Sequence, residues 1–207
     1  MIDKAKIIGM NMSPAGTQAF FKSLGKPVLT FFGYSAEYEN QEAMLAVARK
    51  GVSKIPPDAV LINIGATASG IGAIYPLAKA MGFTTSGIVS SVAAEHMENI
   101  SEAVDYVCFV DDTQWGGKVK GTDRLSPTSQ AMVACSDVLV AIGGGEVTRD
   151  ELMAAKALGK PVHFYPAEVS HRHLLQRAQK RNEPTPQSFW GAAHEVFGPQ
   201  EGDFMGE

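Results

Sequence analysis

The sequence predicts an α/β fold: a doubly wound, Rossmann-like parallel sheet of about six strands in a three-layer α/β/α arrangement. Short apolar runs alternate about six times with longer segments of helical periodicity, which is the pattern of repeated strand–helix units. Three of these runs end in turns rich in glycine and serine, and a parallel sheet binds its ligands beyond the carboxyl ends of its strands. With 207 residues, 45% of them hydrophobic, the chain can bury one substantial core.

Each expected strand is a short apolar run bounded by glycine, proline or polar residues. The expected strands are residues 28–32, 59–64, 85–89, 106–110, 138–142 and 161–165. Helices are expected at 40–52, from the 65–72 turn to Gly82, from Ser126 to Cys135, from Thr148 to Gly159 and at about 170–182. Residues 90–103 are expected to form a loop with a short helix. Residues 111–124 form the longest irregular loop, a kind of segment that tends to be functional.

The expected domain organisation is a single Rossmann domain with two flanking segments. The domain covers residues 27–182 and contains all six strands. Residues 1–26 are interpreted as an N-terminal extension, in which 5–10 are compatible with a short strand and 17–24 with a short helix. Residues 183–207 are interpreted as a weakly ordered C-terminal tail.

Composition excludes several classes of partner. The formal charge of −4 lacks the basic footprint of a general nucleic-acid binder. No apolar run approaches ~18 residues and the N-terminus lacks a signal-peptide pattern, so we expect a cytoplasmic protein with no membrane partner. Cys108 and Cys135 lack metal-ligand spacing, so we expect buried thiols and no metal site.

The candidate site consists of three turns that follow expected strands: Gly33-Tyr34-Ser35, residues 65–72 and residues 143–148. A glycine turn that leads into a helix presents backbone N–H groups to an anion, and the helix dipole favours negative charge there. One such turn is weak evidence, but three meet at the same edge of a parallel sheet. The expected ligand-binding residues are Gly33, Ser35, Gly65, Thr67, Ser69, Gly70, Gly143, Gly144, Gly145 and Thr148.

These turns depart from the best-known nucleotide motifs. The run from Gly143 has Thr148 where a G-x-G-x-x-G fingerprint needs glycine, and the run from Gly65 has Thr67 at the second glycine. The Lys-Ser/Thr pair of a P-loop is also missing. We therefore expect no standard NAD or ATP pocket and no certain cofactor, but a phosphate-bearing nucleotide is a possible ligand, with the 111–124 loop over its base or sugar.

The turn after residue 142 resembles a motif of the SLOG superfamily, the LOG-like and DNA-processing-protein-A-like Rossmann proteins, some of which are called lysine decarboxylase-like. Its hydrolase members carry Pro-Gly-Gly-x-Gly-Thr-x-x-Glu, of which residues 143–151 keep two glycines, the Thr and the Glu. Residues 65–73 keep the first and fourth glycines of the family's Gly-Gly-Gly-x-x-Gly-x-Met-Gly, and Gly33-Tyr34-Ser35 resembles its Gly-Ser after the first strand. The resemblance covers about residues 27–168.

The resemblance implies nucleotide binding and a homo-oligomer, and it implies a catalytic role for Glu151 in a nucleoside-5′-monophosphate phosphoribohydrolase or related N-glycosidic-bond enzyme. The family's Glu-Arg-Lys run falls on Pro127-Thr128-Ser129, which carries no charge. A phosphate-clamping Arg would then be Arg149, Arg124 or a residue of another subunit. A third reading is a structural oligomer without a dedicated ligand.

Several residues have a structural reading beside the functional one. Thr148 and Glu151 match a capping box, which by itself would explain Glu151. Asp111-Asp112 suits a ribose hydroxyl or a metal, or simply a solvated strand end. The basic helix 171–181 suits a phosphate, an acidic neighbouring subunit or solvent. Trp115 and Trp190 are interpreted as packing or interface aromatics, and His194 is given no role.

Overall fold

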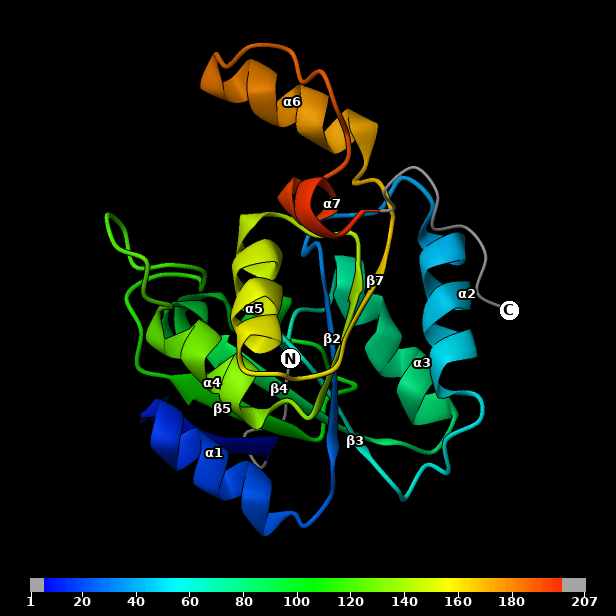
Figure 1. Ribbon diagram of the computed structural model, residues 1–207, viewed down its shortest axis with the longest axis vertical. Coiled ribbons are helices and arrows are strands. Elements are labelled where there is room, and N and C mark those ends of the chain that lie inside the picture. Colours follow the sequence, from blue (N-terminus) through cyan, green and yellow to red (C-terminus); the bar gives the residue numbers. More distant parts are fainter. Residues whose placement is uncertain (1–5, 199–207) are drawn as a thin grey trace.

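The computed structural model describes residues 6–198 and shows a three-layer α/β/α fold around a seven-stranded, all-parallel sheet (Figure 1). The strand order is β1-β5-β4-β3-β2-β6-β7. The strands are β1 (Ile7–Met12), β2 (Val28–Gly33), β3 (Leu61–Ile64), β4 (Thr84–Ser90), β5 (Tyr106–Val110), β6 (Val138–Ile142) and β7 (Val162–Tyr165). The predicted fold class is confirmed, and the sheet has seven strands rather than about six.

Two layers of helices cover the sheet because side chains alternate between its faces along each strand. Phe31 of β2 packs in the cluster that contains α2 and α3 residues, and Phe32 packs in the cluster that contains α1, α4 and α5 residues. The helices are α1 (Pro14–Ser23), α2 (Gln41–Val52), α3 (Ile74–Ala80), α4 (Pro127–Cys135), α5 (Glu146–Ala157), α6 (His171–Arg181) and α7 (Ala192–Phe197). Two 3₁₀ segments, η2 (Gly70–Ala73) and η3 (Ser91–Asn99), follow β3 and β4.

The N-terminal residues that the sequence set apart as an extension contribute to this sheet and its helical cover. β1 pairs in parallel with β5 at the edge of the sheet, and Phe21 of α1 is buried in the same cluster as Ala131 of α4. The burial pattern of β1 is mostly intermediate or exposed. Its sequence therefore lacks the continuous apolar character of the central strands. Residues 1–5 lie outside the described residues.

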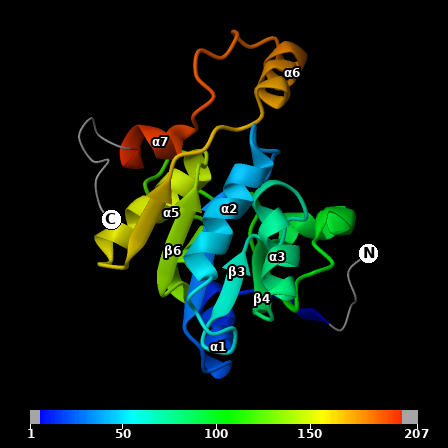
Figure 2. The same ribbon diagram turned by 90° about the vertical axis from the view of Figure 1, so that its right-hand side faces the viewer.

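The C-terminal segment forms α6 and α7 beyond one end of the sheet, as Figures 1 and 2 show. The N-cap of α6 is Ser170, whose side chain accepts a hydrogen bond from His173 N, and its C-cap is Asn182, which has the left-handed conformation. The segment after α6, expected as a weakly ordered tail, returns so that Ala193 N donates to Gly144 O (3.1 Å). Residues 199–207 of the expected tail lie outside the described residues.

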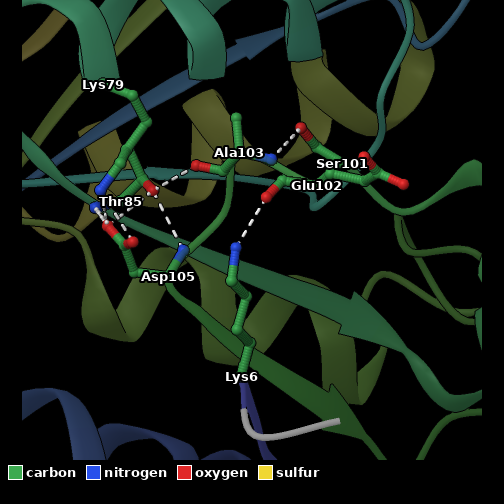
Figure 3. A network of polar contacts seen from close by, with 7 residues as sticks. All are labelled: Lys6, Lys79, Thr85, Ser101, Glu102, Ala103 and Asp105. Carbon is green, nitrogen blue, oxygen red and sulfur yellow. Dashed lines mark hydrogen bonds and ion pairs between the residues drawn. The ribbon is translucent and has the colours of Figure 1, made fainter. Parts of the chain in front are cut away.

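A polar network joins β4 and β5 where both strands begin (Figure 3). The Asp105 carboxylate accepts hydrogen bonds from Lys79 Nζ (2.8 Å) and from Thr85 N (2.9 Å). Burial raises the pKa of Asp105, but the hydrogen bonds from Lys79 and Thr85 outweigh it and hold the pKa below its ordinary value. On the same side, Lys6 Nζ donates to Glu102 O (2.7 Å) just before β1. These contacts connect the residues at the starts of β1, β4 and β5.

The topology places a switch point between β2 and β6. From β2 the chain builds the sheet through β3, β4 and β5 in one direction, and it then returns to add β6 and β7 in the other. Gly33, at the end of β2, pairs with Ile142, at the end of β6. The carboxyl edge at such a switch point is where doubly wound sheets open a crevice for ligands. Among the described residues, no helix has the length and apolar character needed to cross a membrane.

Candidate ligand-binding site

The glycine turn after β6 has a conformation that side chains would disturb. Gly143 and Gly144 have φ values of 60° and 133°, which favour glycine. A Cβ on Gly143 would come within 2.6 Å of the Tyr34 ring, and one on Gly144 within 2.5 Å of Thr148. The turn is therefore packed tightly between β2 and α5. These two glycines allow the turn to pack closely against Tyr34 and Thr148, but they do not line either cavity.

α5 begins earlier than the sequence indicated, and the capping-box prediction is wrong. Gly145 is the N-cap and Glu146 the first helical residue. Thr148 Oγ1 donates to Gly33 O (3.3 Å), and Glu151 turns to Ser129 instead of the helix start. Within the described residues, the backbone N–H groups of residues 145–148 have no hydrogen-bond partner. Four donors and the positive end of the helix dipole are thus available at the switch point.

A first cavity, of about 570 Å³, collects most of the predicted site residues. It lies beyond the ends of β2, β3 and β4, and its walls also come from η3, α4 and α5. The predicted residues that line it are Gly33, Ser35, Gly65, Thr67, Ser69, Thr148 and Glu151. The other lining residues are mostly apolar, and they include Phe31, Phe32, Ile64, Ile88, Ala93, Ile100 and Met132. The volume lies within the range of small-molecule sites.

The turns after β2 and β3 are fastened to each other. Ser69 Oγ donates to Ser35 O (2.7 Å), and Ile71 N donates to Tyr34 O (2.8 Å). Gly70 has a φ of 58°, and a Cβ there would collide with the carbonyls of Tyr34 and Ala36. Gly70 therefore allows the close approach of the two turns. It does not line either cavity.

Glu151 is a buried carboxyl group on the wall of the first cavity. Glu151 is only 4% exposed, and its Oε1 accepts a hydrogen bond from Ser129 Oγ (2.6 Å). Burial raises the pKa of Glu151 to about 8; the bond from Ser129 lowers it and the nearby Asp150 raises it. The carboxyl is therefore mostly protonated at pH 7. Gly117 N donates to the same Ser129 hydroxyl (2.7 Å), which connects the loop to Glu151.

The two arginines that the sequence offered as phosphate clamps do not line the site. Arg149 is paired with its neighbour Asp150 (2.9 Å). Arg124 is exposed at the end of the 111–124 loop. Neither contributes to the walls of the two cavities, so these positions offer a bound phosphate no direct contact in this structure.

The 111–124 loop is anchored to α4 and reaches the first cavity with one aromatic ring. Asp112, of the Asp111-Asp112 pair, accepts hydrogen bonds from Thr128 N (2.9 Å) and Gln114 N (3.1 Å). Burial raises the pKa of Asp112, but these hydrogen bonds hold it below its ordinary value. Asp112 thus organises the loop. Trp115 lines the cavity, and its ring stacks on that of His96 at 6.0 Å.

A second cavity, of about 660 Å³, lies on the other side of the same turns. Four residues line both cavities: Gly33, Ser35, Val147 and Thr148. Gly145 and Glu146 bring the start of α5 to the second cavity, whereas His173 and Arg177 approach from α6. The segment after α6, including Ser188 and Trp190, forms another part of its wall.

Sequence reasoning missed the parts of the walls that lie outside the glycine turns. Ser90 is the last residue of β4, and His96 and Asn99 come from η3, whose 3₁₀ geometry gives no periodic signal in the sequence. Arg177 was noticed as part of a basic helix, but only the fold places it opposite the start of α5. Trp115 and Trp190 were interpreted as packing or interface residues. Their position in segments without regular structure could have indicated a binding role, because binding residues are often found on loops.

No protein-family model matches this chain, and a search of curated proteins returns no match. Among solved structures, the chain is similar to the Moco carrier protein from Chlamydomonas reinhardtii, with 25% identity and a TM-score of 0.49 over 68% of this chain and 76% of that one. A second structure of that protein gives 26% identity and a TM-score of 0.47 over the same shares. The chain is also similar to DNA processing protein A from Streptococcus pneumoniae, with 14% identity and a TM-score of 0.48 over 68% of this chain and 50% of that one.

The similarity concerns the fold. Because one fold supports many activities, the function of this chain has to follow from its own site.

Proposed function

We propose that this protein binds a nucleotide or nucleotide-derived, phosphate-bearing ligand at the carboxyl edge of the sheet, between β2 and β6. The observation that carries the proposal is the set of free N–H groups at residues 145–148, which stand where two ligand-sized cavities meet. Such groups at a helix start bind anions well. Arg177 adds a cation on the opposite wall of the second cavity.

The first cavity suits the uncharged part of such a ligand. Its walls are mostly apolar, and its buried carboxyl, Glu151, is mostly protonated at pH 7. A neutral carboxyl does not repel a nearby phosphate, and it can donate a hydrogen bond to a ring nitrogen or carbonyl. His96 and Asn99 supply further polar atoms at the wall. A base or another planar ring therefore fits here, with the phosphate directed toward the start of α5.

A thermal-shift screen tests the proposal. The panel contains nucleoside mono-, di- and triphosphates, ADP-ribose, NAD and the molybdenum cofactor named for the Chlamydomonas proteins, each compared with its dephosphorylated counterpart where one exists. A ligand at about 100 times its dissociation constant stabilises the native state by ~2.7 kcal/mol. We expect stabilisation that requires the phosphate. Stabilisation by none of them would contradict the proposal and favour a structural role.

A second candidate function is hydrolysis of an N-glycosidic bond, and the position of Glu151 favours it. The carboxyl lines the ligand cavity and holds a proton at neutral pH, as a general acid needs. In such a reaction water adds to the anomeric carbon, the bond to the base breaks, and the base leaves with a proton. Analysis of products from each stabilising ligand decides between the two functions. Free base that disappears in Glu151→Gln, with binding retained, would establish the enzyme.

A further inference from the structure

The two cavities adjoin each other at the start of α5. Gly33, Ser35, Val147 and Thr148 line both of them. Each volume, about 570 and about 660 Å³, is by itself within the range of a small-molecule site. A mononucleotide that fills the first cavity and directs its phosphate to the start of α5 leaves the second cavity unused. The site is therefore larger than the proposed function alone requires.

The chain has two tryptophans, and each lines one of the two cavities. Both residues remain accessible: Trp115, which lines the first cavity, is 58% exposed, and Trp190, which lines the second, is 40% exposed. Large aromatic rings that are left open in a cavity are stacking surfaces for planar ligands, because every nucleobase has a π-face. The two positions come from unrelated segments, the loop before α4 and the segment before α7.

Each tryptophan is supported by a histidine ring. His96 stacks on Trp115 with ring centroids 6.0 Å apart and planes at 26°. His194 stacks on Trp190 with centroids 4.5 Å apart and planes at 22°. A ring that is held by a neighbour loses less freedom when a ligand stacks on its open face. The histidine to which the sequence assigned no role thus supports a ring of the second cavity.

The donors for phosphate lie between the two aromatic positions. The free N–H groups of Val147 and Thr148 belong to residues shared by both cavities. Arg177 and His173 are on the side of the second cavity, while Glu146 contributes one carboxylate there. The order along the site is thus an aromatic ring, a set of anion-binding donors and a second aromatic ring.

We propose that the ligand is elongated and carries two planar ring systems joined by a phosphate-bearing linker, as in the dinucleotides. One ring stacks on Trp115 in the first cavity, the linker lies on the N–H groups at the start of α5, and the other ring stacks on Trp190 in the second cavity. This inference rests on the proposed function, because it specifies the class of the phosphate-bearing ligand.

Single-tryptophan variants test the inference, since Trp115→Phe and Trp190→Phe each leave one fluorescent reporter in one cavity. The probes are NAD and diadenosine diphosphate, with AMP and ADP as one-ring counterparts. We expect a dinucleotide to quench both reporters, and a mononucleotide to quench one. Dinucleotide affinity should exceed that of AMP at least tenfold. Trp115→Ala and Trp190→Ala should each weaken dinucleotide binding about tenfold or more, because stacking on one base contributes a comparable factor.

The outcomes separate this inference from the proposed function. If AMP and the dinucleotides bind with equal affinity and quench the same single reporter, the ligand has one ring and the inference is wrong, although the proposed function stands. Two equivalents of AMP, one quenching each reporter, with no gain for a linked pair, would also overturn it. Failure of every phosphate-bearing probe would overturn both. Circular dichroism and thermal unfolding of the variants confirm that each is folded before titration.

Discussion

The protonated state of Glu151 leads to a stability prediction with a definite sign. The residue is 4% exposed, and its pKa rises from the ordinary value of 4.5 to about 8, mainly through burial. Below about pH 4.5 the carboxyl is protonated in both the folded and the unfolded chain, so it makes no pH-dependent contribution. Between pH 4.5 and 8 the folded chain binds more protons than the unfolded one. Stability must therefore fall as the pH rises through this window.

The magnitude follows from the difference between the two pKa values. Each pH unit in the window corresponds to ~1.4 kcal/mol, so the cost is on the order of 3 kcal/mol at pH 7. Glu151→Gln removes the titration and keeps an oxygen that accepts the bond from Ser129 Oγ. We expect the unfolding free energy of the variant, relative to the wild type, to increase from pH 4.5 to 8 and then to level off.

Urea unfolding at a series of pH values measures this difference. Glu95→Gln, which changes an exposed carboxyl on η3, is the matched control, and its difference from the wild type should vary little across the same range. A pH-independent difference for Glu151→Gln would refute the reasoning. It would mean that Glu151 is ionised at pH 7 in the folded protein, and the neutral character of the first cavity would be lost.

Three further predictions concern other contacts. Thr148→Val loses the hydroxyl that donates to Gly33 O and so holds the start of α5 beside the phosphate position. It should weaken ligand binding about five- to tenfold in a thermal-shift titration, whereas Thr148→Ser should retain affinity; equal affinity in a folded Thr148→Val would contradict this prediction. Lys160 Nζ donates to Val133 O (2.7 Å) and Ser136 O (2.6 Å) and so caps the end of α4. Lys160→Met should lower the unfolding free energy by ~2 kcal/mol in urea, whereas the exposed Lys54→Met should change it little. An equal effect of the two substitutions would show that Lys160 does not cap the helix. The pKa of Asp105 is lowered in the folded protein. The unfolding free energy of the wild type should therefore exceed that of Asp105→Asn above about pH 4, and this difference should be lost as the pH falls through the pKa of folded Asp105. A difference that persists in acid would contradict this interpretation of the network in Figure 3.

The central strands were predictable because they are buried on both faces. Residues 106–110 and 138–142 were placed with the bounds that the structure gives to β5 and β6. A buried parallel strand is a continuous apolar run, and its signal is local. β1 is different, because it is an edge strand with a mostly half-exposed pattern, and only its pairing with β5 makes it a strand. Tertiary contacts, and not the segment's own pattern, decide such cases.

The start of α5 shows why a local sequence motif does not determine where a helix begins or which partners its side chains bond to. Thr148 and Glu151 have the spacing of a capping box, yet the helix begins at Glu146 with Gly145 as its N-cap, after a turn in which Gly143 and Gly144 have positive φ values. Thr148 then bonds to Gly33, which is 115 residues away, and Glu151 bonds to Ser129. Long-range partners displaced the local ones. The glycine turns could be predicted from sequence, whereas the second cavity depends on how the segment after α6 folds back on Gly144.

Hydrogen exchange at the start of α5 tests the central claim most directly. In the free protein the N–H groups of residues 145–148 have no partner within the described residues, so they should exchange quickly. A phosphate bound at the switch point accepts hydrogen bonds from these groups. Exchange measured by mass spectrometry, with the ligand found in the screen and without it, should show protection of the 143–149 segment that a dephosphorylated analogue does not produce. A ligand that binds tightly and leaves the exchange of this segment unchanged would contradict the account.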